Sequence, residues 1–155
     1  MWINPENPGQ GQSTRLIGKQ CNGNTNVGPY WTINLYGAGS GGSNPLLSSN
    51  GANQTDGVDS AVISYSTWSY VVATYLNGDG GTNKLYHNGS LLKTGTTAYS
   101  TPFGYSANYP ILFGNSGNWN NGKSYKLGPV HIYNKVLTDV EVSKNYNVMK
   151  HRFGI

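Results

Sequence analysis

The sequence predicts an all-β fold: an antiparallel sandwich of two sheets with one short helix near the C-terminus. Short segments of alternating, β-branched or aromatic residues recur along the chain, separated by turns rich in Gly and Asn. Gly (22) and Tyr (12) are abundant, and both favour turns and strands over helix interiors. Only the region from Leu137 to Met149 carries a helical signal. We therefore expect one domain spanning residues 1–155.

The first half of the chain contains most of the expected strands. They are Trp2 to Pro5, Ser13 to Gln20, Tyr30 to Tyr36, Val58 to Tyr65 and Trp68 to Leu76. The third strand alternates most clearly, with Trp31, Ile33 and Leu35 on one face and Tyr30, Thr32, Asn34 and Tyr36 on the other. Gly37 to Asp56 is rich in Gly, Ser and Asn and is expected to be a long loop.

The second half begins with a hairpin signal. The Asn88-Gly89 pair lies between two apolar segments, and both residues tolerate the positive φ of a type I′ turn. A strand is expected at Ile111 to Phe113, and a loop at Asn115 to Lys123. The closing strand, from Tyr125 to Tyr133, is followed by a helix start. Thr138 and Glu141, three residues apart, can form a capping box.

Periodicity alone leaves a jelly roll and an immunoglobulin topology open, and a family resemblance favours the jelly roll. The Tyr-Asn-x-x-Leu-Thr-x-x-Glu pattern from Tyr133 to Glu141 resembles the end of laminin-G-like domains of the concanavalin A-like lectin/glucanase superfamily. The segments Trp68 to Tyr75, Lys84 to Leu92 and Ile111 to Gly114 resemble three further motifs of this family, in the family's order. The resemblance implies a concanavalin A-like jelly-roll sandwich.

The same resemblance predicts a missing strand. Trp2-Ile3-Asn4-Pro5 resembles a strand that normally lies inside the family's domain, after an earlier strand that pairs with the closing one. We therefore expect the domain to lack the family's first strand and to leave its closing strand, around Leu127 to Tyr133, without that partner. Unpaired edges recruit other strands, so we expect a homo-oligomer or docking on a larger assembly. Arg152 to Ile155 are expected near the contact.

Catalysis by a glycosidase mechanism is not expected, although many relatives of this kind are glycosidases. Such enzymes need two carboxylates about 5–10 Å apart. This chain has six acidic residues and no Glu-x-Asp-x-x-Glu pattern. Asp139 and Glu141 are assigned to the helix start, and no Gly-x-Ser-x-Gly nucleophile motif occurs. His87 and His131 are interpreted as surface or half-buried strand residues.

Calcium is the one cofactor considered, since laminin-G-like domains often hold one ion. The candidate ligands are Asp56, Asp59 and Asp79, but Asn, Asp and Gly clusters also serve turns, and the turn interpretation is favoured. No other cofactor is expected. Cys21 has no nearby His or second Cys and is interpreted as an incidental free thiol.

Carbohydrate binding suits the composition better, because sugars stack on aromatic rings and their hydroxyls pair with amides. The best candidate is Trp119, flanked by Asn118 and Asn120 in a polar loop. Tyr105 and Tyr109 are weaker candidates, and a structural role for Trp119 is rated equal to a binding role. Trp2, Trp31 and Trp68 are assigned to the core.

The expected partners are other virion proteins or a second copy of the chain, together with glycans. Lys and Arg are scattered singly and the net charge is +4, which does not favour nucleic-acid binding. No apolar run predicts membrane insertion. Asn145 to Ile155 resembles the ends of laminin-G-like domains in tailed-phage structural proteins, which implies a virion surface location. A secreted cellular lectin or adhesin module is the alternative, and a polysaccharide-degrading enzyme the third hypothesis.

Overall fold

The structure is a computed structural model that describes residues 1–6, 13–19, 31–36, 46–50, 58–60, 63–76, 81–97, 111–114 and 124–155. Its strands are β1 (Trp2–Pro5), β2 (Ser13–Lys19), β3 (Trp31–Tyr36), β4 (Leu46–Asn50), β5 (Val58–Ser60), β6 (Ser69–Tyr75), β7 (Gly81–His87), β8 (Ser90–Thr97), β9 (Ile111–Phe113) and β10 (Tyr125–Leu127). The helix α1 (Asp139–Met149) runs into a short 3-10 helix, Lys150–Phe153. None of the helices in these residues has the length and apolarity needed to cross a membrane.

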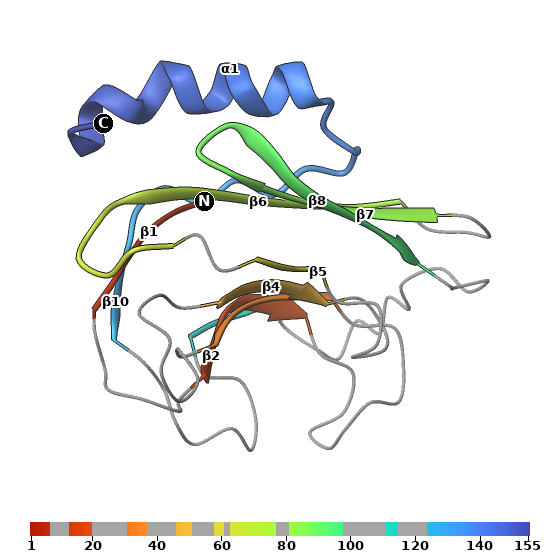
Figure 1. Cartoon of the computed structure of the whole chain (residues 1–155), viewed down its shortest axis with the longest axis horizontal. Coiled ribbons are helices and arrows are strands. Elements are labelled where there is room, and N and C mark those ends of the chain that lie inside the picture. The colour runs from red at the N-terminus through yellow and green to blue at the C-terminus, as the bar shows by residue number, and fades with distance from the viewer. Residues whose placement is uncertain are drawn as a thin grey trace.

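The described strands form two antiparallel sheets of five strands each. The helix-side sheet has the order β10-β1-β6-β7-β8, and the opposite sheet has the order β5-β4-β3-β2-β9. In Figure 1 the two sheets form stacked layers, and α1 lies across the outer face of the helix-side sheet. The predicted fold class, a two-sheet antiparallel sandwich with one short C-terminal helix, is therefore confirmed.

Successive side chains of the helix-side sheet point to opposite faces, and each face is covered by a hydrophobic cluster. Ile3, Val71 and Leu85 point between the sheets, where the core cluster is completed by Met1, Leu16, Ile17, Ile33, Leu35 and Ile63. The neighbouring residues point outward toward α1 and form a second cluster of Trp2, Tyr70, Tyr86, Leu137 and Val142. Because successive strand residues face opposite sides, one sheet serves both clusters. We call the second set the helix-side cluster.

The predicted hairpin joins β7 to β8 with Asn88 and Gly89 as its two central residues. Both have positive φ, 49° and 82°, as a type I′ turn requires. The Asn88 side-chain oxygen accepts a hydrogen bond from the Tyr70 amide at 2.8 Å. A Cβ on Gly89 would lie 2.9 Å from the Tyr146 ring. The hairpin therefore needs glycine for its backbone angle and for its close contact with α1.

The predicted capping box at the start of α1 is also confirmed. The Glu141 amide donates to the Thr138 hydroxyl at 3.2 Å, and the Thr138 amide donates to the Glu141 carboxylate at 2.8 Å. Two amides that have no partner inside the helix are thereby satisfied. Lys150, which begins the 3-10 helix, lies over the Tyr146 ring at 5.5 Å.

Three expectations about strands differ from the structure. Leu46–Asn50 is a strand, β4, inside the stretch predicted to be a loop. The strand expected from Val58 to Tyr65 ends at Ser60 in β5, and Tyr65 lies in a turn. The closing strand, expected to reach Tyr133, ends at Leu127 in β10. The strand β4 was not predicted because Gly and Ser residues surround Leu46 and Leu47 and no alternation is visible there. This strand is stabilised by pairing with β3, which the local sequence does not show.

The closing strand β10 is the edge strand of the helix-side sheet and pairs with β1 alone among the described strands, so the expectation that the family's earlier strand is missing beside it stays a prediction. β1 pairs with β10 through Ile3↔Leu127 and Pro5↔Tyr125, and it pairs with β6 on its other side. The Gly128 amide also donates to the Trp2 carbonyl at 2.9 Å. β1 therefore pairs with one side of β10, over the few residues from Trp2 to Pro5.

Candidate functional site

A cavity of about 420 Å³ lies between β6 and the segment 130–137, which connects β10 to α1. One wall is formed by Tyr70 to Tyr75 of β6, the other by residues 130–137, and Met1 closes one end. Ile17, Trp31, Ile33 and Ile111 from the opposite sheet line it from below. We call this cavity the β6 slot.

The β6 slot lies at the edge of β6 rather than on one of its faces. Val71 and Ala73, which pack toward the inter-sheet core, line it together with Val72, which packs toward the helix-side cluster. Residues of both faces can line one cavity only where that cavity runs along the strand edge. The slot therefore opens through the plane of the helix-side sheet.

The sheet order explains the slot. β1 lies between β10 and β6, so these two are two strand spacings apart, about 10 Å. The Met1 amine donates to the Val71 carbonyl at 2.9 Å, and the Val71 amide donates to the Met1 carbonyl at 2.8 Å. β6 continues to Tyr75, and the segment 130–137 forms the other wall of the slot.

The main chain of β6 points into the slot at Ala73. The Tyr70 carbonyl accepts from Asn88 and the Leu76 amide donates to Thr82, so even-numbered residues turn their polar groups toward β7. Odd-numbered residues turn theirs toward β1, as Val71 does with Met1. No hydrogen bond from the Ala73 main chain to this side occurs among the residues that the structure describes.

The other wall, residues 130–137, is apolar and exposed. Ile132 is 56% exposed, Tyr133 45% and Val136 42%, whereas Leu137 is buried in the helix-side cluster. Within the described part of the chain, no main-chain hydrogen bond holds Val130 to Val136. The wall thus offers both apolar side chains and main-chain groups to an occupant.

The two ionisable groups at the slot with a described partner or burial effect are the Met1 amine and the Lys135 ammonium. Burial lowers the pKa of the Met1 amine to about 5. The Lys135 ammonium is paired with the Glu141 carboxylate, and this bond, together with the Thr138 contacts, lowers the pKa of Glu141 to about 2. No Asp or Glu of the described part of the chain lines the slot.

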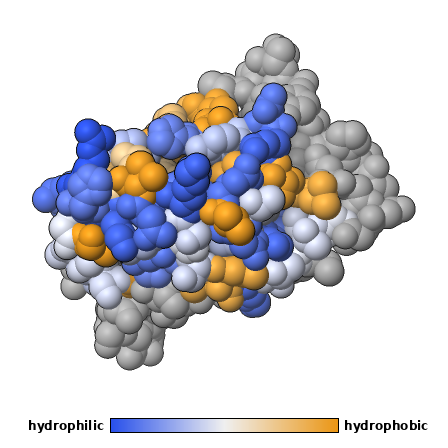
Figure 2. All heavy atoms as spheres, turned by 90° about the horizontal axis from the view of Figure 1, so that it is seen from above, coloured by the Kyte–Doolittle hydropathy of each residue, from blue (hydrophilic) through white to orange (hydrophobic). Residues whose placement is uncertain are grey.

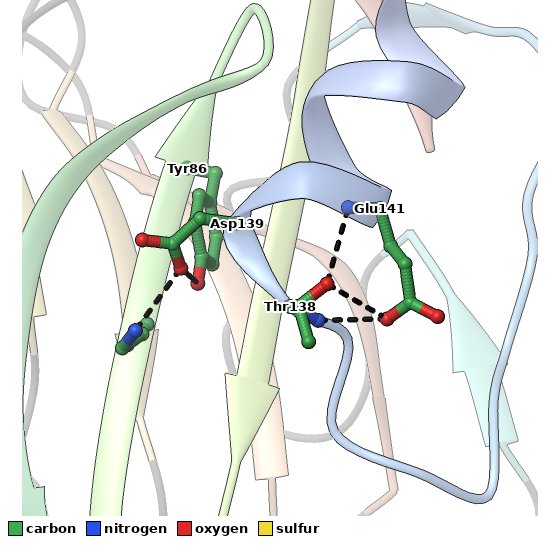
Figure 3. A network of polar contacts seen from close by, with 5 residues as sticks. Tyr86, Thr138, Asp139 and Glu141 are labelled. Carbon is green, nitrogen blue, oxygen red and sulfur yellow. Dashed lines mark hydrogen bonds and ion pairs between the residues drawn. The ribbon is translucent and has the colours of Figure 1, made fainter.

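Asp139 serves a structural contact outside the slot, shown in Figure 3. Its carboxylate accepts from the Tyr86 hydroxyl at 2.7 Å and from the Lys84 ammonium at 3.0 Å. These bonds lower the pKa of Asp139, while burial and the carboxylate raise the pKa of Tyr86. The network ties the first turn of α1 to β7, so both acids at the helix start are structural, as predicted.

One Ser–His contact occurs in the helix-side sheet. The His87 ring nitrogen lies 3.1 Å from the Ser69 hydroxyl, and burial lowers the pKa of His87. Ser69 is only 2% exposed, so a substrate cannot reach it as a nucleophile. His87 is half-buried in a strand, as predicted, whereas His131 is exposed on the slot wall.

The predicted sugar-binding and metal-binding residues are not tested by the structure. Trp119, Asn118, Asn120, Tyr105, Tyr109, Asp56, Asp79 and Cys21 lie outside the described residues. Asp59 lies in β5, and its side chain is not described. Among the residues that are described, no three His, Cys, Asp or Glu side chains come together in a group that could hold a metal ion.

Figure 2 shows the α1 side of the molecule. Hydrophobic residues lie there in small groups separated by hydrophilic ones. Val140 and Val148, 77% and 61% exposed, are examples on α1. Scattered exposed apolar residues are ordinary and mark no site. The β6 slot differs because aliphatic side chains and main-chain groups converge in one cavity.

Sequence reasoning missed the slot because it treated Leu127 to Tyr133 as a regular strand. No local pattern marks it, because its walls come from β6 and from residues 130–137, which lie far apart in the sequence.

The fold is a two-sheet antiparallel β-sandwich, and the slot lies between β6 and residues 130–137. The chain belongs to the concanavalin A-like lectin/glucanase superfamily, whose laminin-G type sequence model matches residues 1–143. No protein in a comparison with curated sequences matches the chain.

Solved structures show the same fold. One is the binding domain of botulinum neurotoxin DC in complex with rat synaptotagmin II, with a TM-score of 0.58, 16% identity, and 96% of this chain covered. Another is the botulinum neurotoxin type G receptor-binding domain, with a TM-score of 0.56, 15% identity, and 96% covered. This chain spans 34% and 36% of those chains, about a third of their length. At such identities the likeness concerns the fold alone.

Proposed function

We propose that the domain is a non-catalytic binding module of a phage virion, as part of a fibre, a tail or a capsid decoration. The non-catalytic role is supported mainly by the structural contacts that the acidic residues make. Of the six in the chain, Asp139 and Glu141 stabilise the start of α1, and no acidic residue that the structure describes lines the β6 slot. The chain belongs to a superfamily that contains both lectins and glucanases. Because its sequence lacks the paired-carboxylate pattern of the glucanases, this membership supports a binding role.

The virion context is supported by the sequence of the C-terminus. Asn145 to Ile155 resembles the ends of laminin-G-like domains in tailed-phage structural proteins, and most of it packs as α1 and the 3-10 helix on the helix-side sheet. Low charge and abundant Tyr, Asn and Gly agree with this context. A secreted lectin or adhesin module is the alternative placement.

Glycan binding is a second candidate function, favoured by the composition of one loop. Trp119 stands between Asn118 and Asn120, a combination that offers a stacking ring and amides to a sugar. Tyr105 and Tyr109 are the supporting candidates. If the domain holds a metal, we propose that it is a calcium ion bound by Asp56, Asp59 or Asp79.

Three measurements test these proposals. The chain should be found by mass spectrometry in purified particles of the phage that encodes it, and should release no reducing ends from polysaccharides. Glycan-array binding should be lost in Trp119→Ala and largely kept in Trp119→Phe, which retains a stacking ring. Absence from particles would contradict the virion role, and turnover of a polysaccharide would contradict the non-catalytic role. Binding that Trp119→Ala leaves unchanged would contradict the glycan site.

A further inference from the structure

We propose that two copies of the chain associate through the edge of β8, with the two strands antiparallel about a two-fold axis. The inference goes beyond the proposed function, because it concerns self-association and names its surface. It starts from the lengths of the edge strands. Among the described strands, β10, β5 and β9 each contribute three residues to a sheet edge, whereas β8, Ser90–Thr97, contributes eight. A short edge strand gives a partner little to pair with, and a long one is an association site.

The regular part of the β8 edge runs from Lys93 to Thr97. Leu85 of β7 lies opposite Lys93, but the next residue, Tyr86, lies opposite Leu91, so a β-bulge separates the first part of β8 from the rest. From Lys93 onward, five consecutive residues pair with β7 without a shift. This part of the edge is straight enough to pair with a second strand.

The main chain of Thr94 points away from β7. The Leu76 amide of β6 donates to the Thr82 carbonyl of β7, so even-numbered residues of β7 turn their polar groups toward β6 and odd-numbered ones turn theirs toward β8. In β8, the partners of those odd-numbered residues are Lys93, Gly95 and Thr97. Thr94 and Thr96 lie between them and therefore direct their amides and carbonyls outward. No hydrogen bond to the outward side of Thr94 occurs among the residues that the structure describes.

The side chains at this edge are exposed on both faces of the sheet. Thr94 lies opposite Lys84, which is two residues from Tyr86 of the helix-side cluster, so Thr94 faces the helix side. Lys93 lies opposite Leu85 of the inter-sheet core and faces the other way. Both Thr94 and Lys93 are exposed, so an approaching strand meets an accessible edge.

A two-fold axis at Gly95 uses the whole regular edge. Thr94 would lie opposite Thr96 of the second copy and could exchange two hydrogen bonds with it, and the symmetric pair would add two more. Gly95 would face Gly95 of the second copy in the closer, non-hydrogen-bonded kind of pair, with about 4.5 Å between Cα atoms. Glycine has no side chain that could obstruct this approach. The two helix-side sheets would then join into one continuous sheet.

Lys93 opposes pairing, since lysine on an edge strand commonly prevents association. In the two-fold arrangement, however, each Lys93 lies at one end of the paired segment, opposite Thr97 of the second copy. The two lysines are then four residues apart along the strand direction, or about 14 Å. Exposed charges are largely screened beyond roughly 8–10 Å at physiological salt. This register therefore keeps the repulsion small.

The partner is a second copy because the edge is complementary to itself. Both copies present outward main-chain groups at the same residues, so neither has to break a ladder of its own to form the pair. The β8 strand is also already ordered by its pairing with β7. A flexible segment of another protein would lose conformational entropy on binding, which a second β8 strand does not.

The full chain tests the proposal through its mass and its hydrogen exchange. Analytical ultracentrifugation should show a monomer–dimer equilibrium with a dissociation constant below about 1 mM. The Thr94 and Thr96 amides should exchange at least twofold more slowly after a hundredfold increase in protein concentration. The Lys93 and Gly95 amides, which point toward β7, should not change. A mixture of labelled and unlabelled chains should give an intermolecular NOE between the Gly95 α-protons of the two copies.

Two variants link the dimer to β8. Thr94→Pro removes the outward amide without removing a hydrogen bond to β7, and should raise the dissociation constant of the dimer at least tenfold. Thr94→Ser keeps that amide and is the matched control, so it should dimerise as the original chain does. Unchanged amide signals from β6 would show that the proline variant is folded. A folded Thr94→Pro chain that dimerises as well as Thr94→Ser would overturn the proposal.

The original chain gives three further decisive outcomes. A mass of one chain at every concentration would mean that the β8 edge does not bind a second copy. A Thr94 amide that is already protected in the dilute monomer would mean that the chain covers this edge itself. A dimer without protection at Thr94 would place the contact elsewhere. Each result would overturn the proposal, and none alters the particle and polysaccharide assays, so failure here is distinguishable from failure of the proposed function.

Discussion

The two edges of β6 are paired to very different extents. On one edge the ladder with β7 runs without interruption from Val71↔His87 to Tyr75↔Asn83. On the other edge, β1 pairs with Ser69 and Tyr70, Met1 bonds to Val71, and the β6 slot follows. Among the described residues, β7 therefore pairs with β6 over most of its length, whereas β1 and Met1 pair with its first residues. A strand edge is satisfied only as far as its neighbour extends.

Packing follows the same division. Where β1 is present, Trp2 is 1% exposed and stacks on Phe153 with ring centroids 4.1 Å apart. On the slot wall, Ile132 and Tyr133 are about half exposed. The filled helix-side cluster should therefore contribute more to stability than the slot wall does. The predictions below test that division by stability measurements.

Trp2→Ala should have the largest effect. Its ring contacts Phe153, Tyr70 at 5.1 Å and Tyr146 at 5.8 Å, so truncation leaves a cavity that these rings cannot all fill. We expect a loss of about 3–5 kcal/mol in the free energy of unfolding, measured by urea denaturation. Trp2→Phe keeps a ring and should lose less.

The matched control for Trp2→Ala is Val140→Ala, because Val140 is 77% exposed on α1. It should change the unfolding free energy by less than about 0.5 kcal/mol. Similar losses for Trp2→Ala and Val140→Ala would show that the helix-side cluster does not carry the stability assigned to it.

Gly128→Ala should have the next largest effect. A Cβ at this position would lie 2.9 Å from the Trp2 Cβ and 3.3 Å from the Phe153 ring. Trp2 is held by its neighbours, so the added methyl forces it to shift at a cost of about 1–3 kcal/mol. Lys126→Ala, an exposed change in β10, is the control and should be neutral. A neutral Gly128→Ala would mean that this side is loosely packed, like the slot.

Thr138→Ala should cost about 1 kcal/mol, because the hydroxyl accepts the Glu141 amide at the start of α1. Thr138→Ser keeps an oxygen at the same place and should recover most of the loss. Thermal unfolding of the two variants side by side provides the measurement. If the Thr138→Ser and Thr138→Ala variants unfold at the same temperature, the hydroxyl of the cap contributes less to stability than its geometry indicates.

Acid should weaken the same cap. The folded pKa of Glu141 is about 2, below its ordinary 4.5, chiefly because Lys135 binds the carboxylate. A depressed pKa means stability that is present above pH 4.5 and is lost as the pH falls toward 2. Glu141→Gln should reduce that part of the pH dependence in urea titrations between these values. Identical pH profiles for both chains would contradict the assignment.

The sequence predicted the filled region well, since its signals are local. The capping box and the Asn88-Gly89 turn each depend on a few neighbouring residues. β4 escaped prediction because Leu46–Asn50 does not alternate, and its strand form depends on pairing with β3. On β3, Thr32 and Asn34 are buried, 1% and 6% exposed, although they occupy the face opposite Ile33 and Leu35. Periodicity separates the two faces of a strand without showing how each is covered.

The slot could not be predicted in this way, because it depends on three segments far apart in the sequence. Val71 to Tyr75 forms one wall, residues 130–137 form the other, and Met1 ends between them. The closing segment was predicted as a strand from its own apolar pattern. Main-chain pairing stops near Pro129, where the Trp2 amide donates to the Pro129 carbonyl at 3.2 Å. That pair joins two segments far apart in the sequence, so the pattern of residues 130–133 does not show it.

The smallest expected effect comes from Ile132→Ala on the slot wall. Ile132 is 56% exposed, so its truncation removes little buried surface and should lower the unfolding free energy by less than about 0.5 kcal/mol. Ile3→Ala is the matched comparison, with the same chemistry at a residue that is 0% exposed, and should cost about 2–5 kcal/mol. Urea denaturation of both variants measures the contrast directly. A large loss for Ile132→Ala would mean that the slot wall packs against the fold in solution, and the division between a filled side and an open edge would then be wrong.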